Sequence, residues 1–130
     1  MLQILPPLSY AVVAVIILMV AIGRGASPAL RWGLPAAAGA LLLLFSLWTV
    51  AEEGLIQFWI NHTTTLAGVQ VWFDLVIAVA ISFVLMAPRA RAVGMPLLPW
   101  GIAVIATASI ALLPMLARLF WLEDRATRQP

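Results

Sequence analysis

The chain contains no cysteine, no lysine and few charged residues of any kind. Of its 130 residues, 9% are charged and 65% are hydrophobic, whereas a soluble domain carries about 25% charged residues. The missing cysteine excludes disulfides, thiolate catalysis, cysteine-ligated zinc and iron–sulfur clusters, and it leaves no signal of redox compartment. So few polar groups could not cover a folded surface in water. The sequence therefore predicts an integral membrane protein, with the lipid bilayer as its solvent.

Several chemical signatures are also missing. All basic residues are arginines, and the net charge of +2 gives no reason to expect a nucleic-acid partner. There is one histidine, no HExxH motif and no glycine-rich phosphate loop. Ser82 and Ser109 fall inside predicted helices with no histidine in reach. We therefore expect a protein that is not an enzyme and that has no metal site.

What the chain does have is apolar runs of membrane length. The runs predict an all-α bundle of four transmembrane helices in one membrane domain, over residues 9–22, 35–51, 70–86 and 97–120, with a charged, frayed tail over 123–130. Each helix needs about 20 residues to cross a hydrocarbon core of about 30 Å, so four use the whole chain. No basic residue precedes the first run, so we expect it to be retained. The segment 54–60 is too short to span and favours an interfacial or re-entrant position, and Pro114 predicts a kink in the fourth helix.

Tryptophan and arginine lie near the predicted helix ends, as membrane-interface residues do. The expected interface anchors are Trp32, Arg89, Arg91, Trp100 and Trp121. If all four helices span, one side of the membrane holds Arg24, Arg31, Arg89 and Arg91, and the other holds Arg118, Arg125 and Arg128. This four-to-three excess places the first and third loops in the cytoplasm, with both termini outside.

Three groups of residues in order resemble the DUF2834 family of small bacterial multi-pass membrane proteins. They are an Asp-Leu pair at a helix start (Asp74-Leu75), a basic loop ending in Gly94-Met95 before Trp100, and a Ser109 to Arg118 stretch with Pro114. The resemblance is clear over Trp72 to Arg118, and the first helix has no counterpart in it. It implies a bundle in the bacterial inner (cytoplasmic) membrane and carries no assigned activity.

Asp74 is the sharpest candidate for chemistry. A carboxylate inside a membrane helix is costly, and its usual uses are proton relay, ion coordination or pairing with a basic group. Asp74 also lies about one turn into its predicted helix, where its charge suits the helix N-terminus. Glu53 is expected on the same side of the membrane, and Arg118 could pair with either acid. These three residues are the candidates for ion or proton handling, or for helix pairing.

His62, beside Trp59, is the candidate cofactor ligand. Its imidazole could hold a haem or a chlorophyll-type pigment, although a hydrated interfacial histidine explains the same pattern. One histidine cannot supply both axial ligands of a bis-histidine haem.

We expect the protein to be a structural accessory subunit that packs against a larger membrane complex. Its helices carry few polar groups, and its partners would be the lipid bilayer and other membrane subunits. No cofactor is required, but lipid, quinone, carotenoid or a chlorophyll-type pigment could come from the partner complex. One alternative is a small proton or cation channel or carrier that uses Asp74 and Glu53. Another is a pigment- or quinone-binding protein that uses His62 and tryptophans.

Overall fold

The chain is all-helical in a computed structural model that describes residues 2–22 and 27–128. A 3₁₀ turn, η1 (Leu2–Ile4), leads into α1 (Leu5–Ala21), and no strand occurs in the described ranges. The other helices are α2 (Pro28–Thr63), α3 (Leu66–Ala92), α4 (Leu97–Thr107) and α5 (Ser109–Ala126). Arg24, one of the arginines used to orient the chain, lies outside the described residues.

Helix starts follow local sequence signals. Prolines occupy the first turns of α1 and α2, where a missing N–H is tolerated. The Ser27 hydroxyl accepts a hydrogen bond from the Leu30 N–H at 3.4 Å, and the Thr65 hydroxyl accepts one from the Gly68 N–H at 3.0 Å. Such N-caps satisfy donors that the helix itself leaves free.

The second and third helices extend well beyond their predicted bounds. Pro35 lies inside α2 and Pro88 inside α3, although the sequence placed Pro35 at a helix start and Pro88 at a helix end. A proline removes only one backbone hydrogen bond, so a helix can continue through it where the flanking turns are otherwise satisfied. Arg31, Arg89 and Arg91 are consequently helical rather than in loops.

A glycine separates the last turns of α2 from the rest of that helix. Gly54 has φ +79° and ψ +160°, a non-helical conformation that only glycine adopts easily. The apolar segment 54–60 therefore begins at a kink and continues as helix to Thr63, so it forms a short helical unit at the end of α2.

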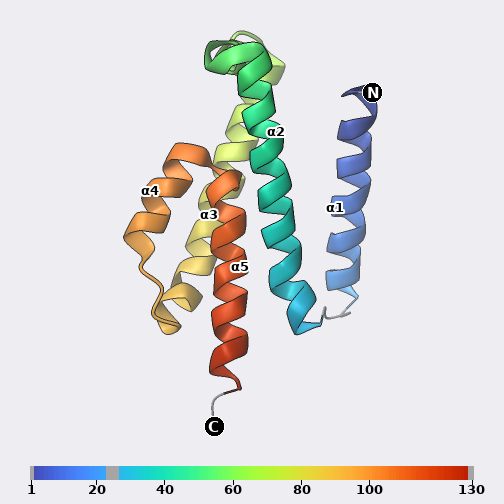
Figure 1. Cartoon of the computed structure of the whole chain (residues 1–130). Helices are drawn as coiled ribbons and strands as arrows, with labels where there is room; N and C mark the ends of the chain where they lie inside the picture. Colours follow the sequence, from blue (N-terminus) through green and yellow to red (C-terminus); the bar gives the residue numbers. More distant parts are fainter. Residues whose placement is uncertain (1, 23–26, 129–130) are drawn as a thin grey trace.

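The fourth predicted helix is wrong as a single element. The chain turns back at Ala108, which has φ +50° and ψ −121°, and α4 and α5 run antiparallel on either side of it (Figure 1). The Ala108 N–H donates to the Val104 carbonyl at 2.7 Å and closes the end of α4. Pro114 lies within α5 rather than at the main bend. As a result the last turns of α5 and the first turns of α1 lie at opposite ends of the structure in Figure 1, whereas the predicted topology needs them at the same end.

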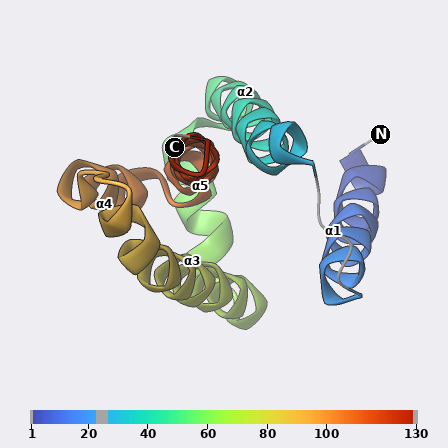
Figure 2. The ribbon, with the colours of Figure 1, turned by 90° about the horizontal axis from the view of Figure 1, so that it is seen from below.

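Helix α5 is the centre of the bundle. Seen from below, it has α2, α3 and α4 around it, whereas α1 stands apart (Figure 2). Helices α2 and α5 pack closely at Gly39 of α2, where an added Cβ would lie 3.1 Å from Pro114 Cδ. Helix α1 contacts no helix other than its own η1 turn within the described ranges.

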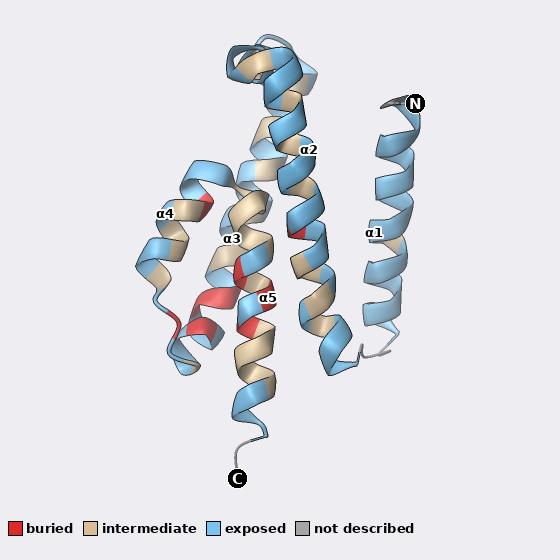
Figure 3. Ribbon diagram, in the orientation of Figure 1, coloured by how far each residue is buried: buried red, intermediate tan, exposed pale blue. Residues whose placement is uncertain are grey.

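The buried residues gather where α3, α4 and α5 meet, around the middle of α5 (Figure 3). The cluster consists of Met86, Ala90, Met95, Val104, Met115 and Leu119. Most other apolar side chains are exposed, and every described residue of α1 is exposed or half-buried.

Two helices, α2 and α3, are long and apolar enough to cross a membrane. Helices α1 and α4 are apolar but shorter, at 17 and 11 residues. An all-helical protein with membrane-length helices is therefore confirmed, while four full spans are not.

Candidate functional site

Four aromatic rings gather where α2 ends and α3 begins. The Gly54 kink and the tight connection at Thr64 and Thr65 bring the last turns of α2 over the first turns of α3. Edge-to-face contacts join Trp72 to Trp59 at 5.7 Å and to Phe58 at 6.4 Å between ring centroids. The His62 ring lies 4.4 Å from Phe58 and 6.3 Å from Trp72. We call Phe58, Trp59, His62 and Trp72 the aromatic cluster.

The hydrogen bonding of His62 fixes which nitrogen can bind a ligand. His62 Nδ1 lies 2.8 Å from the Phe58 carbonyl oxygen. A carbonyl only accepts hydrogen bonds, so Nδ1 must carry the proton. In the neutral ring Nε2 is then an acceptor and a donor of electron pairs to metals. The predicted candidates His62 and Trp59 do lie together, and the sequence missed that Trp72 and Phe58 join them.

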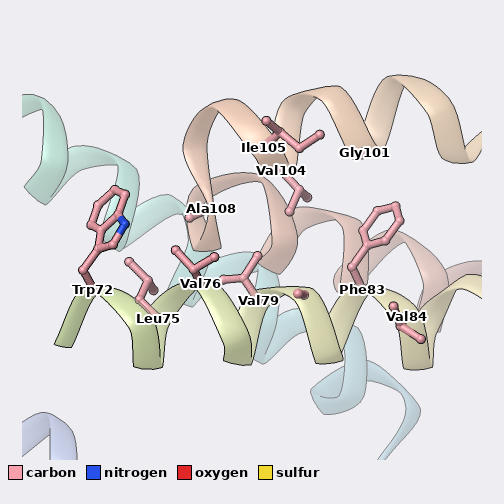
Figure 4. A pocket seen from close by; sticks show the side chains of 11 residues that line it. Trp72, Leu75, Val76, Val79, Phe83, Val84, Gly101, Val104, Ile105 and Ala108 are labelled. Atoms are coloured by element: carbon pink, nitrogen blue, oxygen red, sulfur yellow. The ribbon is translucent and has the colours of Figure 1, made fainter. Parts of the chain in front are cut away.

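An apolar groove of about 410 Å³ runs between α3 and α4 (Figure 4). Its lining is aliphatic or aromatic throughout: Trp72, Leu75, Val76, Val79, Ala80, Phe83, Val84, Gly101, Val104, Ile105 and Ala108. Because α4 ends at Thr107, Trp72 and Leu75 of α3 lie beyond the end of α4 (Figure 4). Trp72 belongs to both the groove and the aromatic cluster, so the two are continuous.

The groove and cluster together offer an apolar channel with a polar acceptor near one end. No charged side chain lines the groove. Volumes of about 300–1,000 Å³ with a few polar groups are typical of small-molecule sites. The arrangement suits a hydrocarbon chain in the groove with a hydroxyl-bearing head near His62. It supplies no nucleophile–base pair.

The structure does not bring together the residues predicted to handle ions. Asp74 and Glu53 are exposed, and Asp74 lies on the opposite side of α3 from Trp72. Arg118 lies four residues beyond Pro114, which packs at the level of Gly39. Glu53 is 14 residues further along α2, about 21 Å by helical rise. Among the residues that the structure describes, no ion pair joins Arg118 to Glu53 or Asp74. Within the described ranges no group of three His, Asp or Glu residues could hold a metal ion.

The strongest polar contacts lie at the other end of the bundle, around Glu123. Arg89 donates from Nε and Nη2 to the two Glu123 oxygens at 2.8 and 2.7 Å. Arg31 donates to Glu123 at 3.4 Å and to Asp124 Oδ1 at 3.1 Å. Both guanidinium groups also lie over the Phe120 ring, at 5.1 and 5.3 Å. This ion-pair cluster joins the start of α2, the end of α3 and the end of α5.

The sequence missed the ion-pair cluster because residues 123–130 were expected to fray. Helix α5 instead continues to Ala126. The sequence does place opposite charges at the ends of apolar helices. These charges predict an ion-pair cluster only once it is known that the helix ends meet.

The expected interface anchors have different surroundings. Trp32 and Trp121 lie near the ion-pair end, and Arg125 lies over the Trp121 ring at 4.4 Å. Arg91 is exposed. Trp100 is half-buried and packs against the methionine-rich core, so it is partly a core residue.

Comparisons with known proteins do not add to the interpretation of the fold and site. The family resemblance of Trp72 to Arg118 stays a prediction, as do the cofactor and partner expectations. Comparison of the chain with protein-family models, with curated proteins and with solved structures finds no match.

Proposed function

We propose that the protein is a small, non-catalytic membrane protein that packs as an accessory subunit against a larger membrane complex. Helices α1, α2 and α3 cross the bilayer, and the α4–α5 hairpin enters from one face and returns to it. Helix α2 rises about 31 Å between Arg31 and Glu52, which matches a hydrocarbon core of about 30 Å.

The ion-pair end faces the cytoplasm in this arrangement. The turn at Ala108 moves Arg118, Arg125 and Arg128 to the end that also holds Arg31, Arg89 and Arg91. The described residues of the other end carry Glu52, Glu53 and Asp74 and no arginine. Six arginines against none is a much stronger positive-inside signal than four against three. The N-terminus is then outside and the C-terminal end inside a bacterial cytoplasmic membrane.

The observation that supports an accessory role is the isolation of α1. This helix is apolar on every side and contacts none of α2 to α5. Association between membrane helices depends on close packing rather than on hydrophobicity. Helix α1 therefore adds little to the stability of the chain itself and offers a complete helix surface to another protein.

Photo-crosslinking along α1 tests this role. A crosslinking residue at Val13 or Ile17, both more than 45% exposed, should capture one recurring membrane protein in native membranes. The same residue at buried Val104 is the control and should react only within the chain. Capture of lipid alone from every α1 position would contradict the proposal.

A second candidate function is binding of a quinol-type amphiphile, which the continuity of groove and aromatic cluster favours. The isoprenoid chain would lie between α3 and α4, and the hydroxyl of the head would donate to His62 Nε2 near the exposed faces of Phe58 and Trp59. The channel alternative gains no comparable support, because its acids lie apart.

Filling the groove tests the second function. An added Cβ at Gly101 would lie 3.4 Å from Phe83 Cζ, so Gly101→Leu should place a side chain in the groove and abolish binding of a short-chain quinol to the purified protein. His62→Leu should weaken binding while leaving the groove open. Gly33→Leu, where nothing lies within 4 Å, is the control. Equal binding by Gly101→Leu and Gly33→Leu would exclude the site.

A further inference from the structure

A second hollow, of about 320 Å³, lies beside the ion-pair cluster, where α2 begins and α5 ends. Its lining is Ala29, Trp32, Trp121, Asp124, Arg125 and Arg128. We call it the basic hollow. Unlike the groove, it combines charged and aromatic side chains, and it belongs to the end at which tryptophan and arginine meet a membrane surface.

The two arginines of the basic hollow differ from those of the ion-pair cluster. Arg31 and Arg89 are held by Glu123 and Asp124. Arg125 and Arg128 are exposed and form no ion pair within the described ranges. Arg125 is held in place by its position over the Trp121 ring. Paired guanidinium groups at a membrane surface match the oxygens of a phosphate ester.

The carboxylate of Asp124 adds a second feature that a ligand of the basic hollow must match, which is an acceptor without a hydrogen-bond donor among the described residues. Its Oδ1 accepts from Arg31, but its Oδ2 is buried and has no hydrogen-bond donor in the described part of the chain. A buried carboxylate oxygen without a donor is unfavourable. Oδ2 is closed to water in this geometry, so a ligand reaches it only after a lining side chain rotates.

We propose that the basic hollow binds a phosphate ester that also carries a primary ammonium group, as in the head of phosphatidylethanolamine. Arg125 and Arg128 bind the phosphate, and the ammonium donates to Asp124 Oδ2 between the two tryptophans. A trimethylammonium head has no N–H to donate, and a glycerol head has no positive charge. The site requires a membrane surface at this end of the bundle and no protein partner.

Native mass spectrometry of the full chain, released from mixed micelles, measures this selectivity. The probes are phosphatidylethanolamine, phosphatidylcholine and phosphatidylglycerol at equal concentration. Phosphatidylethanolamine should bind roughly tenfold more tightly than phosphatidylcholine, the effect of one hydrogen bond to a charged group. Equal binding of these two lipids, or a preference for phosphatidylglycerol, would overturn the proposal.

Variants separate the two parts of the site. Asp124→Asn keeps an Oδ1 acceptor for Arg31 and removes the carboxylate. It should abolish the preference for phosphatidylethanolamine and leave phosphatidylcholine binding unchanged. The double variant Arg125→Gln with Arg128→Gln should weaken the binding of both lipids. Arg91→Gln replaces an exposed arginine outside the hollow and should change the binding of neither lipid. A preference that survives Asp124→Asn would also overturn the proposal.

Two further measurements complete the test. Circular dichroism and thermal melting check that each variant folds. The single variant Arg128→Gln leaves every residue of the ion-pair cluster unchanged, so its effect on lipid binding does not come from loss of that cluster. Competition by soluble O-phosphoethanolamine would identify a free ester as a ligand, whereas retained lipid binding without competition would identify the membrane lipid.

Discussion

At the residue scale, Ala108 determines where the C-terminal part of the chain goes. Its φ of +50° with ψ of −121° is the conformation of the first central residue of a type II′ turn, a position that favours glycine. An alanine in such a conformation costs about 1–3 kcal/mol. The surrounding packing of α5 between α2 and α3 must hold the turn in place.

We predict that Ala108→Gly stabilises the protein by about 1 kcal/mol, because glycine removes this strain. Thermal unfolding in detergent measures the change. The sign of the effect decides between two structures. In a continuous helix over 97–120, glycine at 108 would instead destabilise by about 1 kcal/mol. Ala106→Gly, inside α4, is the control and should destabilise.

Glu123 is a second residue with a large structural role, because it accepts from Arg31 and Arg89 together. Glu123→Gln should lower the free energy of unfolding by about 1 kcal/mol, since the two arginine side chains are 39% and 47% exposed and solvent screens the pairs. The loss should shrink in concentrated salt. Unfolding titrations at low and high salt, with exposed Glu52→Gln as the control, would measure it. Equal losses for the two variants would contradict this role.

At the scale of single elements, the sequence predicts helices well and their ends poorly. The apolar runs predict α1, α2 and α3, because a long run of apolar residues without a helix breaker favours a helix. The sequence does not predict the break at Ala108, since Thr107, Ala108 and Ser109 include neither glycine nor proline. Pro114 is a partial indication that a new helix begins nearby, because a proline is tolerated best near a helix start. Helix α5 begins five residues before it.

The packing of α2 against α5 depends on a small residue at the contact. Gly39→Leu should destabilise by about 1–3 kcal/mol, the usual effect of overpacking, because its Cβ would meet Pro114 and Leu113 at 3.1–3.3 Å. Gly33→Leu, on the same helix with open space, should have little effect. Unfolding in detergent would compare the two, and similar stabilities would show that these helices are not in close contact.

The candidate sites were less predictable than the helices. His62 and Trp59 are close in sequence, so their proximity could be expected. Trp72 joins them only through the tight connection after Thr63. The groove and the basic hollow each need two helices to come together, and in both cases one of the two is a product of the Ala108 break.

At the scale of the whole molecule, the fold predicts which segments share a face of the membrane. The chain has no native cysteine, so single cysteines report position without interference. Cysteine at Thr127 should be labelled from the same side as cysteine at Ala92 and from the opposite side to cysteine at Thr64. Impermeant maleimides applied to intact cells and to inverted vesicles would measure this. Four full spans would instead put Thr127 and Thr64 on one side.

The return of the chain at Ala108 also has a consequence for membrane insertion. In the proposed orientation, α4 and α5 enter from the cytoplasm and leave toward it, so Arg118, Arg125 and Arg128 are never translocated. The only polar connection that insertion must carry across is the short one between α2 and α3. The basic C-terminal segment can therefore form its ion pairs while synthesis is being completed, without its arginines having to cross the hydrocarbon.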